Sequence, residues 1–254
     1  MSYKMIYQYP FMIVGGFIEG TATLMAFVIF WQVILVGQSF GTWKMEEILI
    51  FTALAYFAWG LASLFFTGVW VLPNKIIEGD IERWLCRPIR HPLLGVLFEE
   101  VWVGGSALLV VSILLMSLVG AYYHMQFQLL NLILAFISLA IGITTLYLLY
   151  GSITALAGFT IGRAEFVQEA FDTLEITFAR VPATSLPRGI TTFLMVGFPV
   201  AFLSAFPTEI LLGRLSVNNA IEVLILQVPL CLFWIGTFLI IWKVGISRYE
   251  SASN

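Results

Sequence analysis

Few side chains in this chain could do chemistry, and two adjacent pairs of glutamates are the first candidates. Glu46-Glu47 and Glu99-Glu100 are the residue types that a general acid–base site uses. Neighbouring residues on a helix point about 100° apart, however, so the members of each pair do not face each other. Both pairs also lie at the border of an apolar stretch, where solvated charge is the simpler expectation. We therefore predict no catalytic role for either pair.

Other motifs for catalysis or metal binding are missing from the sequence. The chain lacks a GxxxxGK[ST] phosphate loop and the HExxH, CxxC and GxSxG motifs. His91 and His124 are predicted on opposite sides of the membrane that the apolar segments described below would cross. They are therefore not expected to share a metal ion. We predict that the chain is not an enzyme.

Composition places the chain in a membrane. Hydrophobic residues make up 60% of it and charged residues only 11%, whereas soluble domains carry roughly 25% charged residues. A soluble fold of 254 residues with this composition would have too little polar surface to cover itself. The net charge of -3 and the lack of a basic run indicate no nucleic-acid partner. Because no linker or repeat divides the chain, we predict a single transmembrane domain over residues 1–254.

Six apolar segments of membrane-spanning length predict an all-α membrane protein with six transmembrane helices. The fifth segment is the weakest, because Gly197, Phe198 and Pro199 interrupt its apolar helical pattern. The predicted spans are roughly residues 18–37, 48–72, 101–121, 129–157, 189–206 and 221–242.

The basic residues predict the orientation of these spans. With the N-terminus in the cytoplasm, ten lysines and arginines fall on the inner side, Arg180 and Arg188 among them. Only Lys44 and Arg214 fall outside, which is a strong positive-inside bias and predicts that both termini are cytoplasmic. Glu19, next to the start of the first span, is either a proton or cation site or, more simply, an interfacial charge.

Three further segments are predicted beside the spans. Residues 3–17 contain a proline and two glycines and predict a short interfacial segment before the first span. Residues 164–180 alternate apolar and polar faces at helical spacing, which predicts an amphipathic helix on the cytoplasmic surface. Residues 207–220 are a candidate re-entrant segment between spans 5 and 6. The polar face of the amphipathic helix would carry Gln168, Glu169, Asp172 and Glu175.

The strongest departure from the apolar pattern is the stretch from Pro73 to Pro92, which holds seven charged residues between two predicted spans. Such charge must lie outside the hydrocarbon. Apolar side chains recur at helical spacing over residues 76–87 and predict a short amphipathic helix. Such a helix could dock into a groove of a soluble partner or lie on lipid headgroups, and the periodicity favours neither. The apolar stripe is Ile77, Ile81, Trp84 and Leu85, and the charged face is Asp80, Glu82, Arg83 and Arg87.

A resemblance to a known family favours docking. The run EGDIERWLCRPIRHPL is similar to the pattern Gly-(Glu/Asp)-Leu-Asp-x-Leu-Leu-x-Arg-Pro-x-x-x-Pro-Leu of ABC-2-type transporter permeases, the membrane subunits of ATP-binding-cassette exporters. Glu82 in place of Asp and Trp84 in place of Leu are the departures. The ending RYESASN and the stretch GFPVAFLSAFPTEILLG resemble the same family, in the same order. The residues that match the first motif are Gly79, Asp80, Ile81, Glu82, Trp84, Leu85, Arg87, Pro88, Pro92 and Leu93.

The resemblance implies a transport subunit with no ATPase of its own. Two ABC ATPase subunits would bind ATP and Mg²⁺ on the cytoplasmic side. A second six-span permease, identical or related, would complete the pathway through the membrane lipid. The helix over residues 76–87 would be the coupling helix that seats in the ATPase. Its expected contact residues are Ile77, Gly79, Asp80, Ile81, Glu82, Arg83, Trp84, Leu85, Arg87 and Pro88.

The resulting hypothesis is an ATP-driven exporter of a hydrophobic or amphipathic substrate in a bacterial cytoplasmic (inner) membrane. The residues alone leave two alternatives open, an ATP-independent channel or carrier and a membrane scaffold that binds a partner without transport. The substrate-binding residues, and whether the second permease is a copy or a paralogue, are not specified by the sequence.

Overall fold

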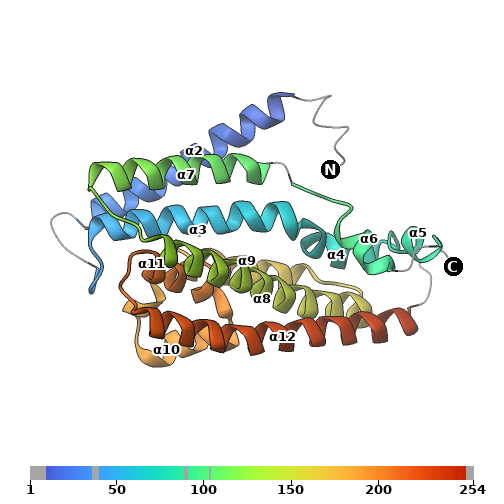
Figure 1. Ribbon diagram of the computed structural model, residues 1–254. Helices are drawn as coiled ribbons and strands as arrows, with labels where there is room; N and C mark the ends of the chain where they lie inside the picture. The colour runs from blue at the N-terminus through green and yellow to red at the C-terminus, as the bar shows by residue number, and fades with distance from the viewer. Residues whose placement is uncertain (1–9, 36–39, 89–90, 103, 250–254) are drawn as a thin grey trace.

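Five long helices that lie side by side form the body of the protein (Figure 1). The computed structural model describes residues 10–35, 40–88, 91–102 and 104–249. Each of the five helices is long and apolar enough to cross a membrane, and a helix satisfies all of its backbone hydrogen bonds without water. They are α2 (Pro10–Ile34), α3 (Met45–Phe65), α7 (Gly104–Tyr122), α8 (Leu129–Ile161) and α12 (Val217–Ser247).

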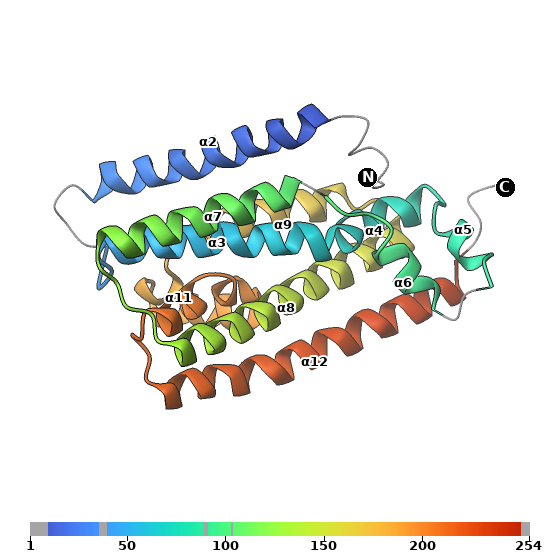
Figure 2. The ribbon, with the colours of Figure 1, turned by 45° about the horizontal axis from the view of Figure 1, so that its top comes forward.

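Shorter elements lie at the two ends of this bundle. The α5 end, on the right of Figures 1 and 2, carries α4 (Thr67–Ile77), α5 (Glu82–Leu85) and α6 (Pro92–Leu97). We call the opposite end the Trp43 end, because it holds the start of α3 and the buried Trp43 that precedes it. These two names do not depend on which end faces the cytoplasm.

Three of the predicted spans are confirmed with small changes at their ends. Helices α7, α8 and α12 correspond to the third, fourth and sixth predicted spans. The second predicted span, residues 48–72, is also helical but is divided at Phe66 into α3 and α4. This division becomes important below, because a cavity lies beside it.

The predicted interfacial segment before the first span is wrong for the part that can be described. Helix α2 begins at Pro10 and continues without a break through Gly15 and Gly16. Proline is well suited to the first position of a helix, and a glycine inside a helix costs only about 1 kcal/mol. Glu19 therefore lies inside α2, with an exposed side chain, rather than at the start of the helix. Residues 3–9 and 36–37 of the two predictions lie outside the described residues.

The fifth predicted span, residues 189–206, is bent rather than one straight helix, and this part of the chain enters and leaves the bundle at the same end. Before it, Thr184 accepts a hydrogen bond from Nε1 of Trp43 (3.3 Å). After it, Arg214 donates to the Thr42 hydroxyl (2.7 Å). Its two arms, residues 188–197 and 199–211, meet at 79°. Because contacts to Trp43 and Thr42 flank the two arms, we describe them as a re-entrant hairpin. The elements are α10 (Arg188–Thr192), η2 (Phe193–Gly197), η3 (Pro199–Phe202) and α11 (Ala205–Leu211).

The re-entrant hairpin therefore lies earlier in the chain than the segment predicted at 207–220. Its returning arm consists of η3 and α11, and α11 is buried throughout. Residues from Val217 onward already belong to α12. The return arm passes so close to α8 that a Cβ at Gly142 would collide with the backbone of Phe202. Glycine at this position lets the hairpin and α8 touch backbone to backbone.

Helix α9 (Glu165–Phe178) carries the chain across the bundle in place of the predicted fifth span. It follows the end of α8 at the α5 end. Gln168 donates to the Tyr150 hydroxyl (3.1 Å), and further along α9 Glu175 accepts from the Tyr147 hydroxyl (3.4 Å). The chain then reaches Trp43 through Thr184. The helix predicted over residues 164–180 is thus confirmed, and it runs along α8 toward Trp43 rather than lying across one end of the bundle.

This path also changes the count of basic residues. Arg180 does not lie at the α5 end, since its guanidinium packs over the Phe27 ring inside the bundle (4.1 Å to the centroid). Arg188 begins α10 only four residues after Thr184, which contacts Trp43, so it lies near the Trp43 end. The prediction from the sequence counts both arginines on the inner side, together with those of the α5 end.

Cysteine labelling tests this topology. With the two native cysteines replaced by serine, Lys44→Cys, Arg163→Cys and Arg188→Cys are three exposed reporter positions. A membrane-impermeant maleimide added to one side of sealed vesicles should label Lys44→Cys and Arg188→Cys together, and Arg163→Cys only from the other side. If Arg188→Cys instead follows Arg163→Cys, residues 189–206 cross the membrane as the sequence had predicted.

Candidate coupling site and inner cavity

The charged stretch between α4 and α6 is a turn with one short helix. Helix α4 ends at Ile77, and Gly79 follows with a φ of +82°, a left-handed conformation that ends helices and suits glycine. The Ile81 amide then donates to the Lys75 carbonyl (3.3 Å) and closes the turn before α5. The single helix predicted over residues 76–87 is therefore wrong in its form. We call residues 78–88 the charged turn.

The apolar side chains of the charged turn face the protein. Ile81 is fully buried, and Trp84 and Leu85 pack half-buried on a cluster that includes Leu72 and Val96. The Trp84 indole lies against Gly95 of α6, where a Cβ would collide with the ring. Trp84, which a docking helix would offer to a partner, here anchors the turn to its own chain.

Glu99 is the centre of the polar contacts beneath the turn. Its Oε2 accepts a hydrogen bond from Nε1 of Trp84 (3.0 Å) and forms an ion pair with Nζ of Lys75 (2.8 Å). Arg83 forms an ion pair with the other carboxylate oxygen. Lys75 is almost fully buried and also pairs with Glu100 (3.3 Å). One lysine thus joins α4 to the loop that leads from α6 into α7.

The environment of Glu99 favours its charged form. Partial burial would raise the pKa of this carboxyl, but hydrogen bonds from Lys75 and Trp84 and the charges of Lys75 and Arg83 outweigh it, so its pKa is lowered. Sequence reasoning treated Glu99 and Glu100 as solvated charges at a membrane border and missed this role. The available signal was Lys75, a lone lysine near the end of a long apolar segment.

The predicted contact residues divide into three groups. Ile81, Trp84 and Leu85 face the protein, while Ile77, Gly79 and Glu82 are half-buried. Arg87 is exposed, and its guanidinium lies 4.3 Å from the centre of the Trp84 ring. The outer surface of the turn is therefore polar and mostly charged. Its exposed residues are Glu78, Asp80, Arg83, Cys86, Arg87 and Pro88.

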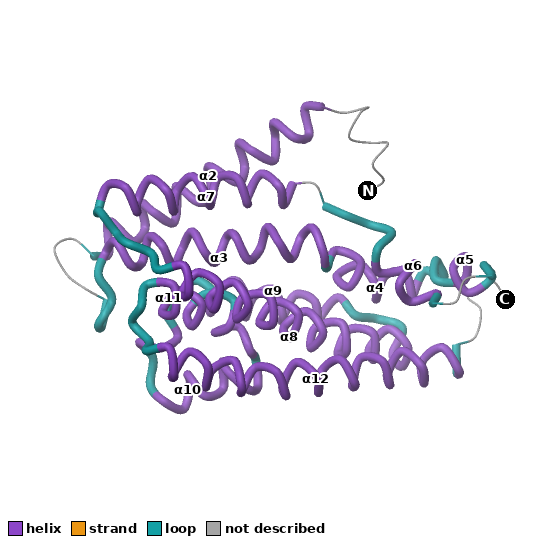
Figure 3. Tube along the Cα trace, viewed as in Figure 1, coloured by secondary structure: helices purple, strands orange, loops and turns teal. Residues whose placement is uncertain are grey.

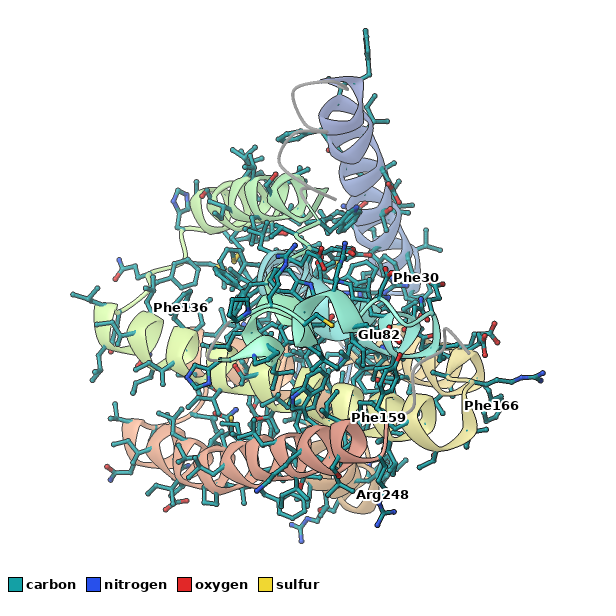
Figure 4. All side chains as sticks on the ribbon, turned by 90° about the vertical axis from the view of Figure 1, so that its right-hand side faces the viewer. Phe30, Glu82, Phe136, Phe159, Phe166 and Arg248 are labelled. Atoms are coloured by element: carbon teal, nitrogen blue, oxygen red, sulfur yellow. The ribbon has the colours of Figure 1, made fainter. Side chains whose placement is uncertain are left out.

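The C-terminal segment also contacts the turn. The Tyr249 hydroxyl donates to Oε1 of Glu82 (3.3 Å), and burial together with this carboxylate raises the pKa of Tyr249. Figure 4 looks onto this end, with Glu82 in front of the bundle and Arg248 at the end of α12. Arg248 and Tyr249 belong to the C-terminal motif that resembles the family, while Ser251 and Ala252 lie outside the described residues.

An open cavity of about 460 Å³ lies beside the break between α3 and α4. Helices α8 and α9 and the loop from α6 to α7, a teal segment in Figure 3, complete its lining. Glu100 lines the cavity and is held by Lys75. The same lysine therefore contacts the cavity wall and, through Glu99, the charged turn.

Two carboxylates of α9, which we call the acidic pair, also line this cavity: Asp172 and Glu175. Glu175 is buried although the sequence pattern placed it on the polar face. The pattern itself was correct, but Glu175 meets the cavity and the Tyr147 hydroxyl rather than water, while Glu169 on the same face is exposed. Among the described residues, no group of three or more His, Cys, Asp or Glu side chains could hold a metal ion.

A family model described as ABC-2 family transporter protein matches residues 17–253. The chain belongs to the ABC-2 transporter family. Comparison with curated proteins gave no match, and comparison with solved structures gave none either. The match includes the charged turn and the cavity, and it confirms the resemblance seen in the sequence.

Family membership gives this ABC-2 permease a general function. It is an integral, multi-pass membrane protein and the membrane subunit of an ABC transporter. Its part in the transporter is transport rather than catalysis, and membership implies association with ABC ATPases in general.

The contacts of Lys75 predict a large effect of removing its charge. Lys75→Met should lower the free energy of unfolding in detergent by about 2 kcal/mol, because it removes one of the two cations that pair with Glu99 and the Lys75 partner of Glu100. Lys243→Met, at an exposed position of α12, is the matched control and should change little. Denaturant or thermal unfolding of the purified permease measures both. Equal stability of the two variants would contradict a structural role for Lys75.

Proposed function

We propose that this permease is the transmembrane subunit of an ATP-driven exporter and that the charged turn docks on a separate ATPase subunit. The observation that carries the proposal is that the apolar and the charged side chains of the turn face different sides. Its apolar side chains are fixed to the bundle, and its exposed charges remain available to a partner. A rigid, charged surface at the end of a membrane bundle suits a specific protein contact.

The ion pairs beneath the turn suggest how movement would be transmitted. A plain loop would absorb a displacement, but this turn is held by Glu99, which Lys75 connects to α4 and to Glu100. When two ATPase subunits close on ATP, the turn would move as one body with α4 and the neighbouring cavity wall. Such closure drives rigid-body or hinge motion through different contacts in the two states.

The basic residues support a cytoplasmic α5 end, as this docking requires. The corrected topology moves Arg180 inside the bundle and Arg188 to the Trp43 end, yet the bias remains. Among the described residues, the α5 end carries Lys75, Arg83, Arg87, Arg163, Lys243 and Arg248, and the Trp43 end carries Lys44, Arg188 and Arg214.

The complete transporter that we propose contains two ATPase subunits, which bind ATP and Mg²⁺, and a second permease, identical or related. It would export a hydrophobic or amphipathic substrate across a bacterial cytoplasmic membrane. These features are expected from the subunit composition of ABC-2 exporters in general. The sequence carries no phosphate loop, so ATP hydrolysis would require a separate ATPase partner.

Co-purification tests the composition of the complex. The tagged chain, extracted in mild detergent, should bring down a protein with a phosphate-loop ATPase motif, identified by mass spectrometry. A second six-span protein in the same complex would indicate a heteromeric transporter, and its absence a homodimer of permeases. An intact, monodisperse permease that captures no ATPase would favour the channel, carrier or scaffold instead.

Charge reversal on the turn tests docking. Arg87→Glu should abolish most of the ATPase stimulation that the permease gives its partner, while membrane insertion is unchanged, because Arg87 is exposed. Arg163→Glu reverses another exposed charge just beyond α8 and should leave stimulation intact. ATPase activity of the reconstituted complex is the measurement. Normal stimulation by Arg87→Glu would refute docking through this surface.

A further inference from the structure

The walls of the inner cavity are aromatic. Its volume of about 460 Å³ lies in the range of pockets for small organic ligands. Trp70 is held in place by stacking on Tyr150, with ring centres 4.4 Å apart and planes 9° apart. We call the four rings of its lining other than Tyr147 the aromatic wall: Trp59, Phe66, Trp70 and Trp102.

The polar part of the lining is acidic. The acidic pair and Glu100 supply carboxylates, and no Lys, Arg or His is among the described residues that line this cavity. Glu100 is paired with Lys75. Asp172 and Glu175 thus place two carboxyl groups in a site whose other walls are largely apolar. Charge in such surroundings is costly unless an opposite charge compensates it.

A smaller hollow adjoins the cavity and shares Trp59, Tyr147 and Glu175 with it. Tyr56 lines this hollow, and its buried hydroxyl has no hydrogen-bond partner. Buried hydroxyls are nearly always partnered. Arg180 also lines the hollow, with its guanidinium over the Phe27 ring and 6.0 Å from the centre of the Tyr56 ring. The hollow therefore offers a polar atom to a ligand that extends beyond the main cavity.

We propose that the cavity binds an amphipathic organic cation between the acidic pair and the aromatic wall. A cation is attracted both to carboxylates and to the faces of aromatic rings, most strongly to those of tryptophan. An anion of the same shape would meet two carboxylates of like charge. A neutral ligand would fill the volume but would make no ionic contact with the acidic pair. This inference names the substrate class and rests on the proposed transport function.

A pair of probes with the same shape and opposite charge tests the proposal. Tetraphenylphosphonium is the hydrophobic cation, and tetraphenylborate is its anionic counterpart. Equilibrium dialysis against the full-length permease in nanodiscs of phosphatidylcholine measures binding, with empty nanodiscs subtracted to remove partition into lipid. We expect saturable binding of the cation only. Equal saturable binding of both ions, or saturable binding of neither, would overturn the proposal.

Substitutions locate the binding site. The double variant Asp172→Asn/Glu175→Gln should weaken cation binding about tenfold or more, since it removes both carboxyl groups that could carry negative charge beside the cation. Asp172→Glu keeps the charge and should bind as the native permease does. Glu169→Gln changes an exposed carboxylate of the same helix and is the matched control. Native affinity in the double variant, or an equal loss in Glu169→Gln, would contradict a site at the acidic pair.

One further variant covers the case in which the double variant does not fold. Trp102→Leu removes a ring of the aromatic wall that is 43% exposed, so folding should tolerate it. We expect weaker binding of the cation, and unchanged affinity would argue against the cavity. Because binding is measured without an ATPase, its failure leaves the docking proposal standing. Failure of docking with intact cation binding would instead indicate a carrier that works without ATP.

Discussion

The ion pairs that Lys75 forms with Glu99 and Glu100 hold the α5 end of the permease together. An ammonium group almost removed from water must be compensated, because its desolvation costs several kcal/mol. The two carboxylates come from the loop between α6 and α7, so compensation of this one charge fixes that loop against α4. The loop in turn carries the acceptor for Trp84 and part of the cavity wall. The charged turn and the cavity thus depend on the same charge.

Length and hydropathy were sufficient to predict α7, α8 and α12, because a lipid-exposed helix must be apolar along its whole length. The same rule failed for α9. Its polar face is typical of a surface helix, but a helix that lines a polar cavity inside a bundle has the same pattern. Glu175 meets Tyr147 rather than water. Only contacts between distant parts of the chain, such as Thr184 with Trp43, distinguish the two cases.

The charged turn shows the same limit on a smaller scale. The sequence correctly located a short charged element between two spans, and Arg87 and Asp80 are exposed as expected. Periodicity assumes one continuous helix, however, and Gly79 breaks it with a positive φ. Once the helix is broken, Trp84 turns toward Gly95 and Glu99. Neither partner is close in sequence, so no local pattern could have indicated where this side chain points.

The shared charge of Lys75 would connect the proposed cation site with the charged turn. The potential inside the cavity depends on the acidic pair and on how closely Lys75 approaches Glu100. A movement of the turn that drew Lys75 away from Glu100 would make the cavity more negative and would strengthen its hold on a cation. A movement in the opposite direction would weaken that hold. Coupling in this permease would then need only a small shift of one ammonium group, because the interaction of charges in an apolar cavity changes steeply with distance.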